Sequence, residues 1–267
     1  MSLSDLISKP DLVAGVTHIY LRSIGSPTDI PAPETSVQDR LVRDNVISGD
    51  CRAISDNFGP RRAYACLEWY RQIQKPDYWS EFLGRVSIRR KSVLDIGCGP
   101  GVTVAQCIER GAASVVGLDS DIEYLSIASE LIGGDSRASL CNATAERLPI
   151  RDQSFDVVVC RVALNYMPLD TVISEVARVL KRDGTFCVIV HGFWYYYRML
   201  FANPRRRAYG LSVIKNGLVR LVKKGERERF LAVRPLSSAA RRAGLHMQEH
   251  WSPASRSDYF GAVFRRS

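Results

Sequence analysis

The segment Val93-Leu94-Asp95-Ile96-Gly97-Cys98-Gly99-Pro100-Gly101 decides the fold of this chain of 267 residues. Its apolar first half is typical of a buried strand, and its glycines predict a tight turn that opens the following helix. The glycine spacing is G-x-G-x-G, because Val102 stands where a dinucleotide-binding fingerprint has its third glycine. Asp95 puts a carboxylate beside the turn, and this suits a ligand that carries positive charge.

Strands and helices alternate outward from this segment. Strands are expected over 92–96, 114–118, 138–142, 155–160 and 185–190, and helices over 102–110, 121–131 and 169–180. Such alternation predicts a parallel sheet with crossover helices. A helix near 236–243 and strand-like runs over 245–251 and 259–264 predict a terminal antiparallel pair. The expected fold is therefore α/β and Rossmann-like, with a mostly parallel seven-stranded sheet covered by helices on both faces.

The remaining segments predict two additions to this sheet. Residues 1–85 are expected to form a helical and irregular N-terminal cap, with a Pro-rich connection over 26–34 and two short helices over 61–84 broken near Pro76. Residues 86–267 are expected to form the ligand-binding domain. Residues 193–231 leave the alternating pattern and are expected to form an aromatic and basic insertion after the fifth strand.

Composition excludes several classes of protein. With 46% hydrophobic and 24% charged residues, the chain has ordinary globular usage. It has no apolar run long enough for a membrane span and no secretory signal, so a cytoplasmic protein is expected. Its seven cysteines are odd in number and lack C-x-x-C spacing, which favours reduced thiols over a disulfide framework or a zinc site.

Positive charge is concentrated at the C-terminal end. The net charge is +9, and residues 191–267 contain 16 Lys and Arg against 4 Asp and Glu. This asymmetry suits an anionic partner, such as nucleic acid, a membrane surface or a phosphorylated acceptor. The alternative is a solvated basic face without a partner.

A second carboxylate follows the second predicted strand. In Val115-Val116-Gly117-Leu118-Asp119, the acid comes 24 residues after Asp95 (119 − 95). An acid at this place can accept hydrogen bonds from both ribose hydroxyls of a nucleoside. The alternative is that Asp119 only caps the next helix. The glycine turn upstream favours the ribose role.

Three further motifs carry a family resemblance. They are AERLP at 145–149, SFDVV at 154–158 and RVLKRDG at 178–184. With the glycine turn and Asp119, the chain over about 90–190 resembles the class I S-adenosylmethionine (SAM) dependent methyltransferases, in particular the type 11 methyltransferase domain. The resemblance implies the Rossmann-like fold, SAM as methyl donor and S-adenosylhomocysteine as product. It says almost nothing about the acceptor.

The resemblance also implies a set of cofactor contacts. The residues concerned are Asp95, Gly97, Cys98, Gly99, Gly101, Asp119, Ser120, Thr144, Ala145, Glu146, Cys160 and Arg161. The glycine turn is expected under the methionine part of SAM, and the backbone near Cys160 and Arg161 is expected at its ammonium group. Asp119 is expected at the ribose and Ser120 beside the adenine.

The adenine side departs from the family pattern. The Ala145 N–H is expected to donate to an adenine ring nitrogen. The family usually has Asp where this chain has Thr144, and that Asp accepts from the adenine amino group. A hydroxyl accepts a weaker, uncharged hydrogen bond, so a modest SAM affinity is expected and Glu146 is a candidate to share the task.

Methyl transfer from a sulfonium is an in-line displacement, so positioning and exclusion of water can supply most of the rate without a metal. A hydroxyl or acidic C–H acceptor also needs a base. The candidates are Asn165, Tyr166 and His191, and His191 is the plausible base at neutral pH. The alternative is that His191 is only hydrogen-bonded at the strand end. Asn165-Tyr166 does not reproduce the N-P-P-Y motif of amino methyltransferases that act on nucleic-acid bases or glutamine. This disfavours such amino groups as acceptors.

The insertion leaves three hypotheses for function. It contains the aromatic run 193–197, then Arg205–Arg207. A predicted amphipathic helix follows, with an apolar face of Leu211, Ile214, Leu218 and Leu221 and the basic residues Arg220, Lys223 and Lys224. Aromatic and basic residues together suit a small-molecule, lipid-linked or glycan-linked acceptor at a membrane surface, which is the favoured hypothesis. They equally suit an RNA or protein methyltransferase. The third hypothesis is a catalytically silent SAM-binding partner protein. For the insertion itself, the alternative is a structural lid whose aromatic residues fill its own core.

Overall fold

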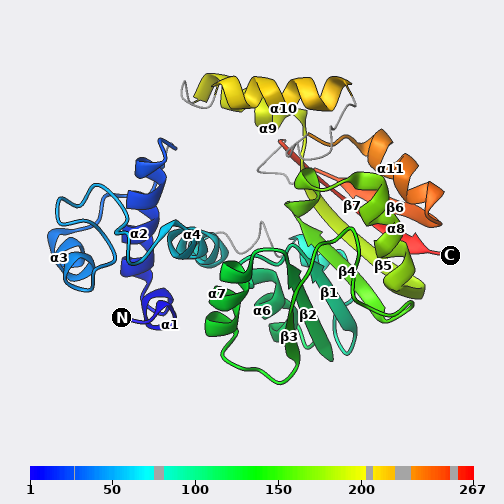
Figure 1. Ribbon diagram of the computed structural model, residues 1–267, viewed down its shortest axis with the longest axis horizontal. Helices are drawn as coiled ribbons and strands as arrows, with labels where there is room; N and C mark the ends of the chain where they lie inside the picture. Colours follow the sequence, from blue (N-terminus) through cyan, green and yellow to red (C-terminus); the bar gives the residue numbers. More distant parts are fainter. Residues whose placement is uncertain (27, 75–80, 203–206, 220–229, 253–257) are drawn as a thin grey trace.

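The computed structural model of the protein describes residues 1–267 except residue 27 and the segments 75–80, 203–206, 220–229 and 253–257. Its framework is a seven-stranded sheet with the strand order β3-β2-β1-β4-β5-β7-β6 (Figure 1). The strands are β1 (Ser92–Ile96), β2 (Ser114–Asp119), β3 (Ala138–Asn142), β4 (Phe155–Arg161), β5 (Leu180–His191), β6 (Leu245–Trp251) and β7 (Tyr259–Arg266). The first five strands pair in parallel, whereas β7 pairs antiparallel with β5 and β6. The predicted sheet and its terminal antiparallel pair are confirmed.

Helices cover both faces of the sheet, as predicted. On one face, α6 (Val102–Glu109) and α7 (Ile122–Ile132) bury Val104, Cys107 and Leu125 against the strands. On the other face lie α8 (Leu169–Val179) and α11 (Val233–Arg242), with Ile173, Val176 and Leu236 in the core. Burial of these side chains on a helical period supplies the main driving force for this layered packing. A 3-10 helix, η1 (Ala163–Tyr166), follows β4.

The fifth strand is longer than predicted. We expected it over 185–190, after a turn at 181–184, but β5 starts at Leu180, which already pairs with Phe155. The register then shifts between Phe155 and Val157, so that Thr185 pairs with Val157. The residues between Leu180 and Thr185 form a bulge in which Asp183 has a φ of 61°. Bulges of this kind insert extra residues without ending a strand.

The N-terminal segment forms a helical layer with its own core. It contains α1 (Leu3–Ile7), α2 (Pro10–Ser23), α3 (Thr35–Arg43) and α4 (Pro60–Gln74). Its core includes Leu6, Val16 and Leu41 and reaches Ile127 on α7. Ion pairs of Arg61 and Arg62 also join α4 to α7. The predicted break near Pro76 lies outside the described residues.

Two helices follow β5 where the sequence departs from alternation. They are α9 (Phe193–Ala202) and α10 (Arg207–Val219), and they lie beyond the carboxyl end of β5, where α9 contacts His191 (Figure 1). We expected Leu211 on the apolar face of an amphipathic helix, yet 56% of its side chain is exposed, and α10 buries Val213 instead. The predicted basic positions Arg220, Lys223 and Lys224 lie outside the described residues. No helix in the described part of the chain has the length and apolar character to cross a bilayer.

Candidate active site

The glycine turn after β1 has a conformation that requires glycine. Gly97, Gly99 and Gly101 have φ values of 71°, 51° and 83°, in the left-handed region that glycine adopts without penalty. A Cβ on Gly97 would lie 2.3 Å from Ala163 Cβ, and one on Gly101 would lie 2.9 Å from Ala128 Cβ. A Cβ on Gly99 would meet nothing within 4 Å. The turn is therefore packed on two sides and open at Gly99.

The backbone of the turn is tied to the neighbouring strand. The N–H groups of Gly97 and Cys98 both donate to the Leu118 carbonyl oxygen, at 2.8 and 3.0 Å. The Cys98 side chain is buried in the core beneath α6, so only its backbone belongs to the turn. This arrangement holds the turn against the end of β2, where Asp119 stands.

Asp119 lies next to the open side of the turn. One carboxylate oxygen accepts from the Gly99 N–H and the other accepts from the Asp121 N–H, each at 2.9 Å. The N-cap of α7 is Asp121, whose side chain accepts from the N–H groups of Glu123 and Tyr124. The helix thus has its own cap, and Asp119 keeps lone pairs for a ligand. Ser120 is exposed beside it.

Asp95 is a buried carboxylate without a hydrogen-bond partner. Its exposure is 1%, and neither oxygen has a partner in the described part of the chain. Burial raises the pKa of Asp95 to about 7, with a further rise from the Asp119 charge and an opposing effect of Arg161. An orphaned buried carboxylate costs free energy unless a cation or donor pairs with it. The ammonium group of SAM has the charge and donors that this position lacks.

Arg161, at the end of β4, joins the site to the N-terminal helices. Its Nη2 lies 3.0 Å from Glu68 Oε2, and only 9% and 6% of the two side chains are exposed. Arg71 Nη1 also pairs with Glu68, at 2.8 Å. Burial alone would raise the pKa of Glu68, but the guanidinium groups of Arg161 and Arg71 hold it below its usual value. Helix α4 therefore places a buried charged group, Glu68, beside the end of β4. Sequence reasoning missed Glu68, whose only signal was an acid in an aromatic helical stretch.

We expect Glu68→Ala to destabilise the protein by about 3 kcal/mol, because it removes a carboxylate shared by two guanidinium groups, one of them buried. Urea unfolding measures the change. Replacing Glu68 and Arg161 together by Leu should recover part of the loss, since the buried charge leaves with its partner. Asp44→Ala removes one partner of the partly exposed pair with Arg40 and serves as the control. If Glu68→Ala lowered the free energy of unfolding as little as Asp44→Ala does, the buried-pair interpretation would be wrong.

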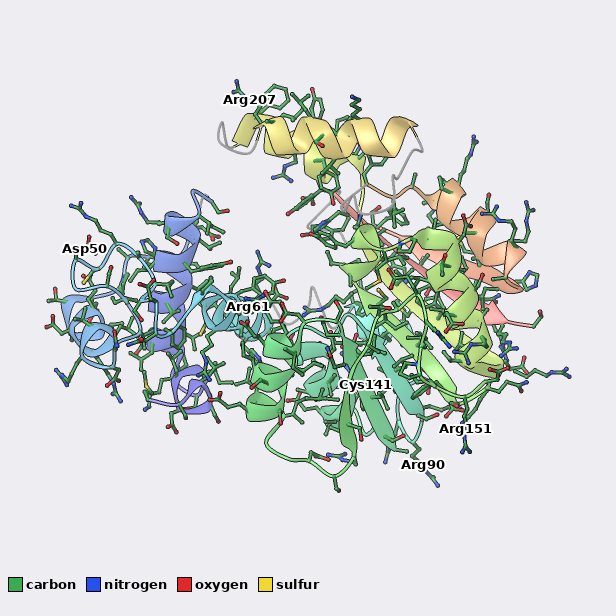
Figure 2. All side chains as sticks on the ribbon, in the orientation of Figure 1. Asp50, Arg61, Arg90, Cys141, Arg151 and Arg207 are labelled. Carbon is green, nitrogen blue, oxygen red and sulfur yellow. The ribbon has the colours of Figure 1, made fainter. Side chains whose placement is uncertain are left out.

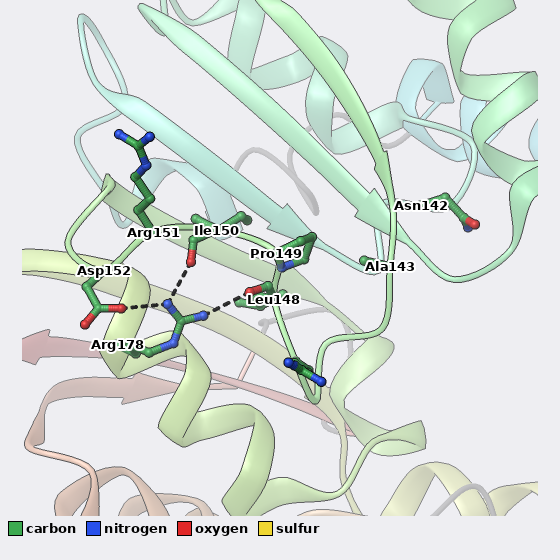
Figure 3. Close-up of a pocket in the computed structure, with 9 residues that line it drawn as sticks. Asn142, Ala143, Leu148, Pro149, Ile150, Arg151, Asp152 and Arg178 are labelled. Atoms are coloured by element: carbon green, nitrogen blue, oxygen red, sulfur yellow. Dashed lines mark hydrogen bonds and ion pairs between the residues drawn. The ribbon is translucent and has the colours of Figure 1, made fainter.

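The loop after β3, which is expected at the adenine of SAM, is held by hydrogen bonds from Arg178. Its guanidinium donates to the carbonyl oxygens of Leu148 and Ile150, at 3.0 and 2.7 Å, and to Asp152 at 2.7 Å (Figure 3). A hollow of about 690 Å³ lies under this loop. It is lined by Asn142, Ala143, Arg147, Leu148, Pro149, Ile150, Arg151, Asp152 and Arg178. None of the predicted cofactor or catalytic residues lines it. Ala145 is buried, whereas Thr144 and Glu146 are exposed.

Two of the three catalytic candidates lie together at the ends of β4 and β5. The Asn165 amide donates to the His191 carbonyl oxygen and accepts from the His191 N–H, both at 2.9 Å. Asn165 therefore positions the backbone of His191. The third candidate, Tyr166, is 52% exposed, and Cys160 is buried in the core.

His191 is surrounded by tyrosines. It is 6% exposed and stacks on Tyr195, with ring centroids 3.7 Å apart and an interplanar angle of 4°. The Tyr259 ring lies edge-on at 4.6 Å, and Tyr196 Oη lies 3.4 Å from His191 Nδ1. Tyr259 was not expected here; the antiparallel register of β5 and β7 pairs it with His191. The arrangement is a buried imidazole with aromatic walls at the carboxyl end of the parallel sheet, where ligands of open α/β sheets bind.

Comparison with known proteins agrees with this geometry. A family model described as a methyltransferase domain matches residues 94–188. The ubiquinone biosynthesis O-methyltransferase of Nitrosomonas europaea is 30% identical over 174 residues, which cover 63% of this chain and 68% of that protein. A SAM-dependent methyltransferase structure from Mesorhizobium loti has a TM-score of 0.56 at 20% identity, over 70% of this chain and 97% of that one. The geranyl diphosphate C-methyltransferase of Streptomyces coelicolor has a TM-score of 0.56 at 13% identity, over 78% and 83%, which shows the fold alone. The chain belongs to the class I SAM-dependent methyltransferases.

Proposed function

We propose that this methyltransferase binds SAM along the glycine turn and methylates a hydroxyl of a small aromatic or lipid-linked acceptor, with His191 as the base. The observation that carries the acceptor proposal is the buried His191 imidazole between Tyr195, Tyr196 and Tyr259. Flat aromatic walls suit an acceptor with a ring of its own. The name of the Nitrosomonas europaea relative, an O-methyltransferase of ubiquinone biosynthesis, supports an oxygen acceptor.

The residues around the turn fit SAM. Asp95 supplies a buried carboxylate for the ammonium group, Asp119 supplies acceptors for the ribose hydroxyls, and the turn is open at Gly99. Thr144 and Glu146 are exposed near the end of β3 and are the proposed acceptors for the adenine amino group. SAM, when bound, supplies a methyl group already activated by its sulfonium.

The proposed reaction is a single displacement. The acceptor hydroxyl gives its proton to the His191 imidazole as its oxygen forms the new bond to the methyl carbon. The carbon–sulfur bond breaks, and its electron pair stays on sulfur in S-adenosylhomocysteine. The charge on sulfur is neutralised in the step, so a dry site with fixed dipoles favours it. Asn165 holds the backbone that carries the base, which keeps the imidazole in place.

We expect Asp119→Ala to weaken the binding of SAM and S-adenosylhomocysteine about tenfold or more, because a hydrogen bond to a charged group contributes about 1.5–3 kcal/mol. Titration calorimetry measures both ligands. Asp135→Ala, which removes a carboxylate from a surface turn, is the matched control. If neither ligand binds folded wild-type protein, the cofactor site is degenerate, and the silent-partner hypothesis takes its place.

An acceptor screen tests the second half of the proposal. Catechols with and without an isoprenoid tail are incubated with SAM, and formation of S-adenosylhomocysteine is measured. Turnover of either class of catechol supports an oxygen acceptor. A comparison of the rates with and without the isoprenoid tail distinguishes a lipid-linked from a small acceptor. If SAM binds but only RNA or protein substrates become methylated, the acceptor proposal is wrong while the cofactor assignment stands.

A further inference from the structure

Helix α9 presents a line of exposed aromatic side chains. Trp194, Tyr197 and Phe201 are 56%, 39% and 67% exposed, and their spacing of three and four residues puts them on one face of the helix. Their rings touch in sequence, with centroids 5.3 Å apart for Trp194 and Tyr197 and 5.1 Å for Tyr197 and Phe201. Leu211 on α10 is 56% exposed. We call these four residues the aromatic stripe. The three contacting rings form one contiguous exposed apolar patch, and such patches mark interaction sites.

The two helices that carry the stripe pack closely against each other, and we call them the α9–α10 hairpin. A Cβ on Gly210 would lie 2.9 Å from Leu200 Cδ2 and 3.3 Å from the Tyr196 carbonyl oxygen, so the helices pack closely there. Arg207 Nε donates to the Leu200 carbonyl oxygen at 2.9 Å. Tyr196 and Val213 are buried. The hairpin already has an inner apolar side, so the stripe is a second apolar surface.

The hairpin is uniformly positive. Residues 193–219 contain Arg198, Arg205, Arg206, Arg207 and Lys215 and no Asp or Glu. The side chains of Arg198, Arg207 and Lys215 are exposed. Arg198 also pairs with Asp258 at 3.7 Å, so Arg207 and Lys215 carry the argument for anionic lipid. Arg207 lies at the outer end of α10, away from the sheet (Figure 2). Aromatic rings next to basic residues complement an interface that has anionic groups at its surface and an apolar layer beneath them.

We propose that the α9–α10 hairpin docks on the surface of a lipid bilayer that contains anionic lipids. The rings of Trp194 and Tyr197 have the amphipathic character of residues that lie at the headgroup level, and Phe201 and Leu211 enter the acyl boundary. The exposed Arg207 guanidinium and the Lys215 ammonium group bind the lipid phosphates. An exposed Leu211 has no part in base stacking, and for this reason a bilayer fits the stripe better than RNA does.

Docking there would bring the bilayer close to the reaction centre. Helix α9 begins two residues after His191, and its Tyr195 and Tyr196 contact the His191 ring. One helix thus contacts the proposed base through one set of tyrosines and exposes the stripe through another. The docking proposal rests on surface residues alone and is independent of the proposed acceptor.

Vesicle cosedimentation without SAM or acceptor tests the proposal. The wild type is expected to bind phosphatidylcholine vesicles that contain phosphatidylglycerol and to bind pure phosphatidylcholine weakly. Trp194→Ala with Phe201→Ala should lower the partition coefficient about tenfold or more. Arg207→Ala with Lys215→Ala should reduce the preference for anionic vesicles and its salt dependence. The control is Ile122→Ala with Met247→Ala, which removes two exposed apolar side chains elsewhere and should change nothing.

Three outcomes would overturn the proposal. The first is wild-type protein that binds neither vesicle. The second is protein that binds single-stranded RNA but no vesicle, which would assign the hairpin to nucleic acid. The third is a concentration-dependent dimer that the Trp194→Ala, Phe201→Ala variant abolishes without any vesicle binding, which would make the stripe a contact between copies. Thermal unfolding shows that each variant is folded whether or not it binds SAM, so a failed proposed function and a failed docking proposal give different results.

Discussion

At pH 8, Asp95→Asn should unfold at a higher temperature than the wild type and yet bind SAM about a hundredfold more weakly. The unliganded protein holds Asp95 as a buried carboxylate without a hydrogen-bond partner in the described part of the chain. Burial raises its pKa from the ordinary 3.8 to about 7. At pH 8 the group is ionised, so the folded state carries a buried charge that Arg161 offsets only in part and that the neutral amide removes.

The sign of the stability effect follows from proton linkage. A carboxyl group with a raised pKa binds its proton more tightly in the folded than in the unfolded state. The favourable contribution of this proton to the free energy of unfolding is present below about pH 4. It is lost as the pH rises through the pKa of the folded state, about 7. The pKa rises by about three units, which corresponds to about 4 kcal/mol. This is the upper bound for the increase in the free energy of unfolding that Asp95→Asn gives at pH 8. At pH 4 the gain should vanish.

Binding of SAM should respond in the opposite direction. Losing one partner of a buried ion pair costs about 3–5 kcal/mol, which corresponds to a hundredfold or more in affinity. Wild-type affinity should fall by up to about tenfold for each pH unit below 7, as Asp95 takes up a proton, while the variant shows no such dependence. Calorimetry across this range, with thermal unfolding of the unliganded protein, measures both effects.

Methylthioadenosine provides the control ligand, because it has the nucleoside of SAM without the amino acid part. Its affinity should be the same for the wild type and for Asp95→Asn. An equal loss for both ligands would mean that Asp95 acts by bracing the turn. A variant less stable than the wild type at pH 8 would mean that the buried charge is compensated in the unliganded protein.

The sheet and the glycine turn could be predicted because their signals are local. Alternating apolar runs define the strands, and a left-handed conformation at Gly97, Gly99 and Gly101 leaves few other residues possible. The start of β5 could not be predicted in the same way. Residues 181–184 (KRDG) look like a turn, and only the pairing of Leu180 with Phe155 extends the strand across them.

The parts of the site that escaped prediction depend on contacts between distant segments. Glu68 meets Arg161 because α4 packs over the carboxyl end of β4, and no periodicity in either segment encodes that contact. Tyr259 meets His191 because β7 runs antiparallel to β5, and a shift of one residue in that register would turn its ring to the other face. The aromatic run 193–197 was visible in the sequence, but its division between the His191 wall and the exposed stripe follows from the α9 helix.

Replacing His191 by Gln should lower kcat about a hundredfold or more for a catechol acceptor that the wild type turns over, because a positioned general base contributes about 10²–10⁴ to the rate. The affinity for SAM should stay unchanged, since the proposed SAM contacts come from the glycine turn after β1 and from Asp119 at the end of β2. Tyr196→Phe removes the hydroxyl near His191 Nδ1 and should cause a smaller loss of kcat.

The competing interpretation is that His191 only fills the end of β5, where its backbone pairs with Asn165 and its ring stacks on Tyr195. That role would lower the thermal stability of His191→Gln and leave kcat of the folded enzyme within a few-fold of the wild type. His246→Gln, the same change at an exposed position of β6, controls for the loss of an imidazole. A large drop in kcat with little change in unfolding temperature requires a proton-transfer role, because a packing defect spread through the folded state has no reason to act on the chemical step alone.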